Sequence, residues 1–256
     1  MKTKTILKIN IKLILNLLSV LPIFGIVTGV SLCKTLKHLP PRIAFPTVSM
    51  SENVAPEKQI LQLIFVIAGI SYFVFSYLYY NYEGKPKIVD RFSSFLQRTL
   101  QVSAALFGFF LILQSLSPLQ DNWNSDLEEF STRKNFQWQT VVHFYSAICM
   151  FFMGFLHMTA YTIFTTVYNK QVCKTLVYKI RFLTFIVFTL SAIVMLYLVT
   201  VELVWNRFGK DIGISVADAN FFGKTEWVSV IGCIFHFFTF RLDAENQEIL
   251  IQSIGN

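Results

Sequence analysis

Six stretches of apolar residues alternate with polar loops along the chain. A helix needs about 20 predominantly apolar residues to cross the hydrocarbon core of a bilayer, and all six stretches are close to that length. The pattern predicts an all-α fold, a polytopic membrane protein that forms a bundle of six transmembrane helices in a single domain, residues 1–256. The predicted spans cover residues 13–33, 60–80, 99–116, 142–164, 182–201 and 226–241.

The first apolar stretch follows a short basic segment, as the core of a secretory signal does. It is longer than a usual signal core and has no clear small-x-small cleavage site, so we interpret it as a retained signal-anchor helix. Gly25 and Gly29 form a GxxxG pattern that allows close helix packing. Pro22, in the same stretch, is a candidate kink.

The loop between the first and second spans, residues 38–58, holds four of the seven prolines of the chain. Proline fixes φ and lacks an amide donor, so this stretch is not a continuous helix. The loop is also rich in Ile, Phe, Val and Met, which predicts that it folds back onto the bundle. Two interpretations stay open. Composition favours an ordinary interhelical loop, and the alternative is a lid over a lipid-sized cavity.

Composition agrees with a membrane protein. The chain is 54% hydrophobic and 14% charged, and it contains 27 Phe and 10 Tyr. A soluble domain carries about 25% charged residues. The length allows one domain of several spans and leaves no room for a separate soluble domain.

The distribution of charge predicts the orientation in the membrane. Lys and Arg are in excess over Asp and Glu on the side that holds both termini and the loops 83–98 and 169–181. Loops rich in Lys and Arg stay in the cytosol. We therefore expect both termini to be cytosolic and the loop 38–58 to be lumenal or extracellular. The net charge of +7 is explained by topology and does not indicate nucleic acid binding.

Familiar catalytic and cofactor motifs are absent from the sequence. The four cysteines form no CxxC pair, so neither a zinc site nor a disulfide framework is indicated, and no metal or cofactor is expected. There is no G-x-S-x-G elbow, HExxH, P-loop or GxGxxG. Motifs alone therefore leave open whether the chain is an enzyme.

Histidines are the first candidates for chemistry, because ionisable groups inside a bilayer are costly and often functional. His143, at the lumenal start of the fourth span, is the candidate catalytic residue. His157 lies in the same helix, on nearly the same face and about 21 Å further along the axis. His157 and His236 are intramembrane polar residues at similar depth, which can pair if the fourth and sixth spans are neighbours. The alternative is that each is a buried histidine bonded to a hydroxyl or a carbonyl.

Further polar residues gather at the predicted lumenal side and are candidates for binding a lipid headgroup. A carboxylate beside His143 can also act as the partner of a general base in acyl chemistry. The simpler alternative is that these residues cap helix ends. The candidates are His38, Glu57, Glu202 and Glu226.

Three stretches carry a family resemblance. The first is the loop LPPRIAFPTVSMSENVAPEK, with a proline, a Val-Ser and then a Pro-Glu. The second is the fourth span, where His143 and His157-Met158 are separated by fourteen residues. The third is the ending, EWVSVIGCIFH up to His236, followed by DAENQEILI. Together they resemble the post-GPI attachment to proteins factor 2 family of the FRAG/DRAM/SFK superfamily.

This resemblance implies residence in Golgi or endoplasmic reticulum membranes. It also implies a part in GPI-anchor lipid remodelling, at the step in which a fatty acid is added back. The implied partners are membrane lipids and the lipid moiety of GPI-anchored proteins. Two positions depart from the family pattern. The His-x-Thr of the last span is here His236-Phe-Phe-Thr239, and the glycine before the loop's Pro-Glu is missing.

The resemblance leaves catalysis and assistance both open. The superfamily also contains non-enzymatic membrane regulators, such as autophagy modulators and partners of phosphoinositide kinases. In that case the basic cytosolic face would be the working surface. A lipid transporter or scramblase is a third possibility, but it needs a polar track, and the sequence offers only His157 and His236 for one.

Overall fold

The computed structural model describes residues 4–38, 48–49, 55–78, 90–117, 138–207, 216–243 and 248–253. Within these residues six long helices form the protein, so the prediction of an all-α membrane bundle is confirmed. Each helix is longer than its apolar stretch or differs from it by a few residues at the ends. The helices are α1 (Ile11–Thr35), α2 (Glu57–Leu78), α3 (Arg91–Leu116), α4 (Trp138–Tyr168), α5 (Leu176–Arg207) and α6 (Val216–Asp243).

Five of these helices, α1 to α5, are long and apolar enough to cross a membrane, by length and composition within the described residues. The sixth, α6, is less apolar because it carries several polar side chains. Most of these side chains turn inward and are buried, whereas the outward residues are mostly apolar, among them Val228, Ile231 and Phe235, with Lys224 as an exposed exception. The outer face of α6 therefore resembles that of its neighbours. The buried polar residues of α6 are Thr225, Glu226, Ser229, His236 and Thr239.

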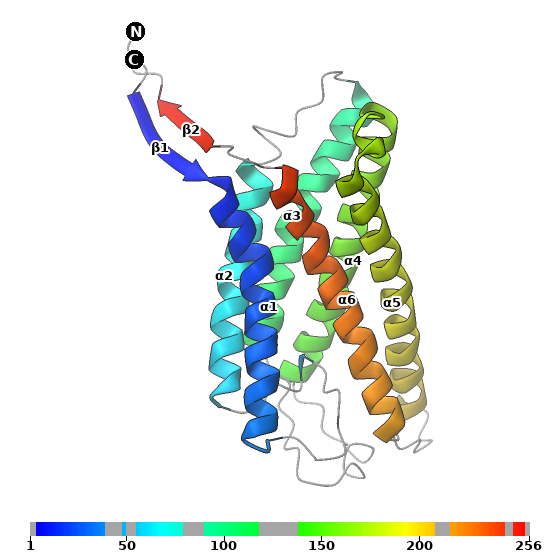
Figure 1. The fold of residues 1–256 in the computed structure, drawn as a ribbon. Helices are drawn as coiled ribbons and strands as arrows, with labels where there is room; N and C mark the ends of the chain where they lie inside the picture. The colour runs from blue at the N-terminus through cyan, green and yellow to red at the C-terminus, as the bar shows by residue number, and fades with distance from the viewer. Residues whose placement is uncertain are drawn as a thin grey trace.

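The helices form a closed ring (Figure 1). Each helix packs on the next one in sequence, and α6 packs on α1 to close the ring; the contact between α4 and α5 is the slightest. Inside lies an aromatic core in which the ring of Tyr72 meets Phe107 and Phe237 at centroid distances of 4.7 Å each. Phe75 and Phe240 extend this core, with their centroids 5.7 Å apart. Burial of such large rings supplies most of the packing.

Glycines permit the closest helix contacts. A Cβ on Gly25 would lie 2.8 Å from Ile64, and one on Gly29 would lie 2.8 Å from Leu61, so the GxxxG pattern of α1 faces α2 as expected. The α2–α3 contact is closer still, because a Cβ on Gly108 would lie 2.5 Å from the backbone oxygen of Gly69. Small residues that let backbones approach are a usual way to pack membrane helices.

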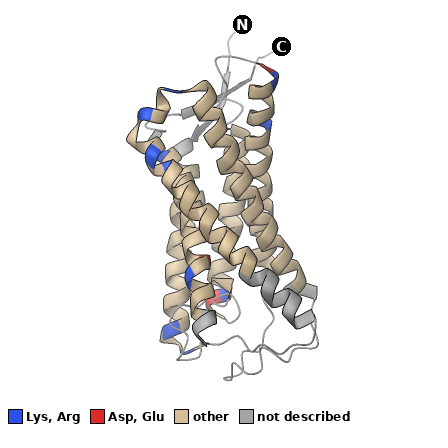
Figure 2. Ribbon diagram, turned by 90° about the vertical axis from the view of Figure 1, so that its right-hand side faces the viewer, with Lys and Arg blue, Asp and Glu red and all other residues tan. Residues whose placement is uncertain are grey.

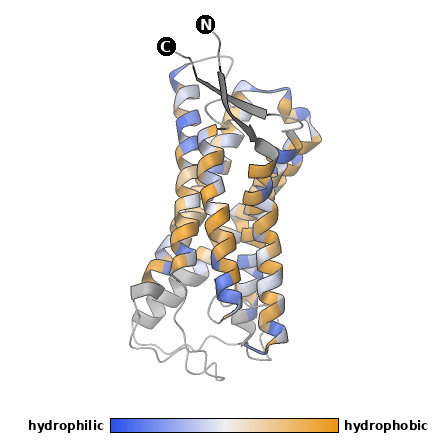
Figure 3. Cartoon of the chain, turned by 90° about the vertical axis from the view of Figure 1, so that its left-hand side faces the viewer, coloured by the Kyte–Doolittle hydropathy of each residue, from blue (hydrophilic) through white to orange (hydrophobic). Residues whose placement is uncertain are grey.

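The outside of the ring is apolar along most of its height (Figure 3). The most exposed helix is α5, which presents a row of large aliphatic side chains to its surroundings, including Leu183, Leu190, Ile193 and Leu196. In water such a surface would be unfavourable, and in a bilayer it matches the lipid tails. The arrangement is therefore that of an integral membrane protein.

Two short strands, β1 (Lys4–Asn10) and β2 (Glu248–Ser253), join the ends of the chain. They pair antiparallel, with Lys4 opposite Ser253 and Asn10 opposite Glu248. This sheet was not predicted from the sequence, in which the first segment stands out only as basic. We call the end of the bundle next to these strands the strand end, and the opposite end, where α1 and α3 stop, the far end (Figure 1).

At the strand end, Asp90 begins α3 with a capping box. Its side chain accepts a hydrogen bond from the Ser93 amide, and the Ser93 hydroxyl bonds back to the Asp90 backbone. The hydroxyl of Tyr168, the last residue of α4, also donates to Asp90. The Ser93 amide, followed by the Tyr168 hydroxyl, lowers the pKa of Asp90 below its ordinary value. These bonds fix where α3 begins and tie it to the end of α4.

Candidate functional site

Three polar side chains meet at the far end of the bundle, and we call them the far-end cluster: Ser49, His143 and Glu226. The Ser49 hydroxyl lies 2.9 Å from Nε2 of His143 in α4 and 3.4 Å from Oε1 of Glu226 in α6. All three residues are buried. The predicted catalytic residue and one predicted binding residue are therefore joined through a serine of the 38–58 loop.

The orientation of His143 is set by backbone carbonyls. Its Nδ1 lies 2.9 Å from the oxygen of Ser117 and 3.3 Å from that of Gln114, both at the end of α3. Carbonyl oxygens only accept hydrogen bonds, so Nδ1 carries the hydrogen. In the neutral imidazole, Nε2 is then the acceptor that faces Ser49.

Glu226 holds the loop segment from the other side. Its Oε2 accepts a hydrogen bond of 3.1 Å from the Val48 amide, and the Ser49 amide also faces this carboxylate. Burying a carboxylate is costly unless it is hydrogen-bonded. The loop donors meet this need, so they bind the segment to α6.

The far-end cluster contains a proton that can occupy two positions. Ser49 has one hydroxyl hydrogen and two partners. When it donates to Nε2 of His143, the contact with Glu226 requires a protonated carboxyl group. When it donates to Glu226, Nε2 must carry a hydrogen, and the imidazole is then charged. The two states hold equal numbers of protons and differ by one proton, which lies on Glu226 in the first and on His143 in the second, with the Ser49 hydroxyl between them.

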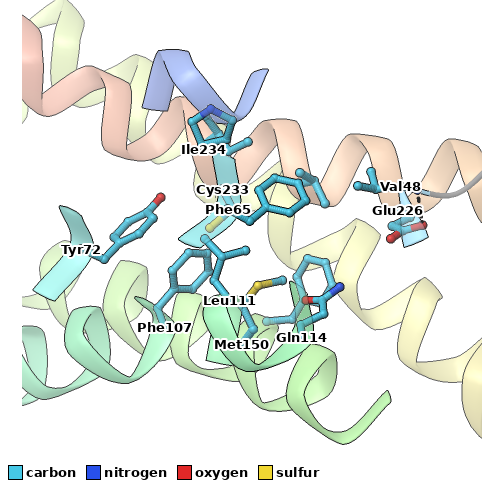
Figure 4. Close-up of a pocket in the computed structure, with 13 residues that line it drawn as sticks. Val48, Phe65, Tyr72, Phe107, Leu111, Gln114, Met150, Glu226, Cys233 and Ile234 are labelled. Carbon is cyan, nitrogen blue, oxygen red and sulfur yellow. Dashed lines mark hydrogen bonds between the residues drawn. The ribbon is translucent and has the colours of Figure 1, made fainter. Parts of the chain in front are cut away.

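An apolar cavity of about 40 Å³ lies beneath the cluster (Figure 4). Val48 and Glu226 line it at one end, and Tyr72 and Cys233 line it deeper in the bundle. The volume accommodates a few water molecules and is not lipid-sized. Of the loop residues that the structure describes, Val48 lines this cavity. A lid over a lipid-sized cavity therefore stays a prediction. The rest of the proline-rich loop, apart from His38, Ser49 and residues 55–58, lies outside the described residues.

The other predicted headgroup residues lie in different places. His38 and Glu57 meet each other, with Nδ1 and Oε1 3.0 Å apart. Glu57 is fully buried, and its second oxygen, Oε2, has no hydrogen-bond partner within the described part of the chain. Glu202 belongs to α5, but its side chain lies outside the described residues. This predicted site is therefore split into the His38–Glu57 pair and the far-end cluster.

His157 and His236 meet across the interior of the ring, with their ring centroids 6.0 Å apart. The side chains of α4 and α6 are neighbours, as this pairing requires, because Tyr161 of α4 also packs against His236 and Phe240 of α6 at centroid distances of 5.9 and 5.0 Å. His157 Nδ1 lies 3.2 Å from the Leu100 carbonyl and 3.4 Å from the Ser103 hydroxyl, as expected for a buried structural histidine. The ring nitrogens of His236 make no hydrogen bond of ordinary geometry to the described residues, although the Arg181 backbone approaches this ring.

Sequence analysis missed Arg181, which it placed at the end of a basic loop. The side chain is only 2% exposed. It extends from α5 and donates from Nε to Thr239 Oγ1 of α6 at 2.6 Å and from Nη1 to the Tyr161 hydroxyl of α4. Its guanidinium also lies 4.2 Å from the centroid of Phe240. The only signal in the sequence was its place at the border between the basic loop and an apolar stretch.

Ser49 was the other residue missed. It lies in the Val-Ser of the loop, which supported the family resemblance but was not selected as a candidate site residue. The cysteines Cys33, Cys149, Cys173 and Cys233 form no disulfide. No group of three potential metal ligands occurs among the residues that the structure describes.

The fold and the site define a class: a polytopic helical membrane protein with a buried serine–histidine–carboxylate cluster at one end. Neither family models, nor curated proteins, nor solved structures include a match to this chain.

Proposed function

We propose that this protein takes part in the lipid remodelling of GPI anchors, at the step in which a fatty acid is added back to the lyso-anchor. The resemblance of the loop, the fourth span and the ending to the post-GPI attachment to proteins factor 2 family motivates this proposal. The observation that carries it is the contact of Ser49 with both His143 and Glu226. Acyl transfer needs a hydroxyl and a base within hydrogen-bond reach, and this cluster has both.

The charge distribution supports an orientation for the proposal. At the strand end, Lys and Arg surround the connection between α4 and α5 (Figure 2). Basic segments favour the cytosol, so the strand end faces the cytosol in this proposal and the far-end cluster faces the lumen. The described basic residues of the strand end are Lys4, Lys8, Lys12, Arg91, Arg98, Lys170, Lys174, Lys179, Arg181 and Arg241.

This orientation fits the substrate chemistry. GPI anchors lie in the lumenal leaflet with their acyl tails among the membrane helices. A lyso-anchor in that leaflet would present its free hydroxyl at the depth of the far end. The proposed location is the Golgi or endoplasmic reticulum membrane, and the proposed partners are membrane lipids and the lipid moiety of GPI-anchored proteins.

A rescue assay tests this function. The chain is expressed in cells that lack the reacylation factor. Surface GPI-anchored protein is measured by flow cytometry, and the anchor lipid by mass spectrometry. We expect the wild type to restore diacyl anchors and His143→Ala to lower them at least tenfold at equal protein level, because the base is lost. Tyr145→Ala is the matched control, since Tyr145 lies two residues along α4 and is 67% exposed.

A second candidate, a non-enzymatic membrane regulator, is favoured by the basic strand end alone. Such a surface attracts anionic cytosolic headgroups. This alternative expects no change in anchor lipid on expression of the wild type. It also expects effects from substitutions at Lys170 and Lys174 and none from His143→Ala. Residence of a tagged chain in lysosomes or the plasma membrane would favour it.

A further inference from the structure

Ser49 and His143 have the geometry of a nucleophile and its base. The hydroxyl oxygen is 2.9 Å from Nε2, which is within reach for direct proton transfer. A third group, the Ser117 carbonyl, orients the base through Nδ1 at 2.9 Å. A serine is activated for covalent catalysis when its hydroxyl is hydrogen-bonded to a base and the base is hydrogen-bonded to a third group that orients it. Here the orienting group is a backbone carbonyl instead of a carboxylate.

The cavity lies next to this pair. Ser49 and His143 do not line it, but Val48, which precedes Ser49, and Glu226, which contacts the Ser49 hydroxyl, both do. Its other walls are almost entirely hydrocarbon, including Phe65, Leu111 and Ile234 (Figure 4). From Glu226 to Cys233, α6 runs about 10 Å along it at 1.5 Å per residue. A group attached to Ser49 would have to pass Val48 or Glu226 to enter this apolar path.

The present cavity is too small for an acyl chain, so the chain must displace side chains. Met150, which lines the cavity, is unbranched and adapts easily. The polar atoms of Glu226 stay at the end next to Ser49. The cavity thus suits a ligand with a polar ester at one end and a hydrocarbon chain beyond it.

We propose that Ser49 is the nucleophile of acyl transfer and carries the acyl group as a serine ester, with the chain in this cavity. The inference rests on the proposed function and names its covalent step. Ser49 Oγ attacks the carbonyl carbon of an acyl ester, and His143 Nε2 takes the hydroxyl proton. The donor's ester bond breaks, and the proton passes to its leaving oxygen or sulfur. The lyso-lipid hydroxyl then attacks the serine ester, and His143 moves the proton from that hydroxyl to the departing Ser49 Oγ.

In this scheme Glu226 is a positioning residue, because it holds the Val48 amide and the Ser49 hydroxyl. The acyl donor is an ester of a fatty acid, either a phospholipid or an acyl-coenzyme A thioester. The orientation proposed above places the site on the lumenal side, so we expect the phospholipid to be the donor.

The experiment uses the full chain in phosphatidylcholine vesicles with either a phospholipid or an acyl-coenzyme A that carries an alkyne-tagged acyl chain. After denaturation, protein-bound alkyne is coupled to a fluorophore and read on a gel. We expect wild-type protein to be labelled from the phospholipid and not from the thioester. This label should resist neutral hydroxylamine, as an oxygen ester does. The amount of protein-bound label should fall at least tenfold in Ser49→Ala and in His143→Ala.

Ser49→Cys distinguishes the chemistry from a folding effect. It should become labelled through a thioester, which neutral hydroxylamine removes. Ser71→Ala is the matched control, because Ser71 is also a buried serine but bonds to a carbonyl of its own helix, Ile67, at 2.8 Å. It should be labelled like the wild type.

The outcomes separate the two proposals. Equal labelling of Ser49→Ala and wild type overturns the assignment of the nucleophile, and so does full rescue of anchor lipid by Ser49→Ala. Rescue by a wild type that is never labelled also overturns it, while the proposed function stands. If labelling depends on Ser49 but the wild type restores no anchor lipid in cells, the assignment of Ser49 as the nucleophile holds. The proposal that the substrate is a GPI anchor is then overturned. If the label is transferred from the acyl-coenzyme A thioester alone, the assignment of Ser49 as the nucleophile holds. The expectation that a phospholipid is the acyl donor is then overturned.

Discussion

The buried side chain of Arg181 connects three helices, and the sequence alone does not reveal that it is buried. A guanidinium can donate in two directions at once and lie flat on a ring, and here it connects Tyr161 of α4 and Thr239 of α6 from its position on α5. The contact between α4 and α5 is the slightest between consecutive helices, so this side chain strengthens a limited interface. That interface also includes the ring pair Phe155–Phe185 and the Thr166–Tyr178 hydrogen bond.

Arg181→Lys should therefore lower stability even though it keeps the charge. A lysine has one ammonium group and cannot reproduce both hydrogen bonds with the ring contact. The loss of one hydrogen bond from a charged group costs about 1.5–3 kcal/mol. Thermal unfolding in detergent should show a clearly lower Tm. Lys179→Ala, an exposed basic residue on the same helix, should leave it almost unchanged. Equal Tm values for Arg181→Lys and wild type would contradict this role.

At the same scale, the sequence was sufficient to select His143, Glu226, His157 and His236, because ionisable residues stand out in apolar stretches. It was not sufficient to show their partners. Ser49 is 94 residues from His143 and 177 from Glu226 along the chain. A local pattern contains no information on such distant contacts, and the Val-Ser of the loop supported a resemblance without indicating what Ser49 contacts.

Among the helices, the closest approach is that of α2 and α3 at Gly69 and Gly108. Any side chain at Gly108 meets backbone, which cannot move aside as a flexible side chain can. We expect Gly108→Val to separate the two helices and to reduce the fraction of folded, monodisperse protein, as measured by size-exclusion chromatography with a fluorescent tag. The expected cost exceeds the roughly 1–3 kcal/mol of ordinary overpacking.

Gly154→Ala provides the comparison. A Cβ at Gly154 would lie 3.3 Å from Cys233 Sγ, a tight contact with a side chain only. This variant should fold nearly as well as the wild type. If Gly108→Val and Gly154→Ala behave alike, the backbone contact between α2 and α3 is not as close as the structure indicates.

Hydropathy predicted the number and approximate position of the helices because lipid-facing side chains must be apolar. It predicted their ends less well: α4 begins at Trp138 and α5 continues to Arg207, both beyond the apolar stretches. The strands were missed for a different reason. β1 and β2 are at opposite ends of the chain and pair with each other, so no local pattern indicates the partner of either strand.

For the whole molecule, the paired strands and the even number of long helices predict that both termini lie on one side of the membrane. The proposed orientation makes that side cytosolic. This can be tested with glycosylation acceptors, since the natural sequence contains none. Glu129→Asn creates Asn-Phe-Ser in the connection between α3 and α4. It should be glycosylated, which a gel shift reversed by endoglycosidase would show.

The matched control is an Asn-Gly-Thr tag appended after Asn256, next to β2. It should remain unmodified. The opposite pattern would invert the orientation and would place the far-end cluster in the cytosol, which removes the lumenal basis of the proposed function. Modification of both sites in one population would contradict a single orientation.

The strand pairing also alters how the bundle can come apart. β1 continues directly into α1, and β2 follows α6 after four residues, while α1 and α6 are neighbours in the ring. In a simple ring the first and last helices are the ones that can peel away, because each has one covalent neighbour. Here the sheet acts as a clasp on these two helices. A force that pulls either terminus outward must first break the hydrogen bonds between β1 and β2. Mechanical unfolding would therefore begin at the sheet and not at a helix.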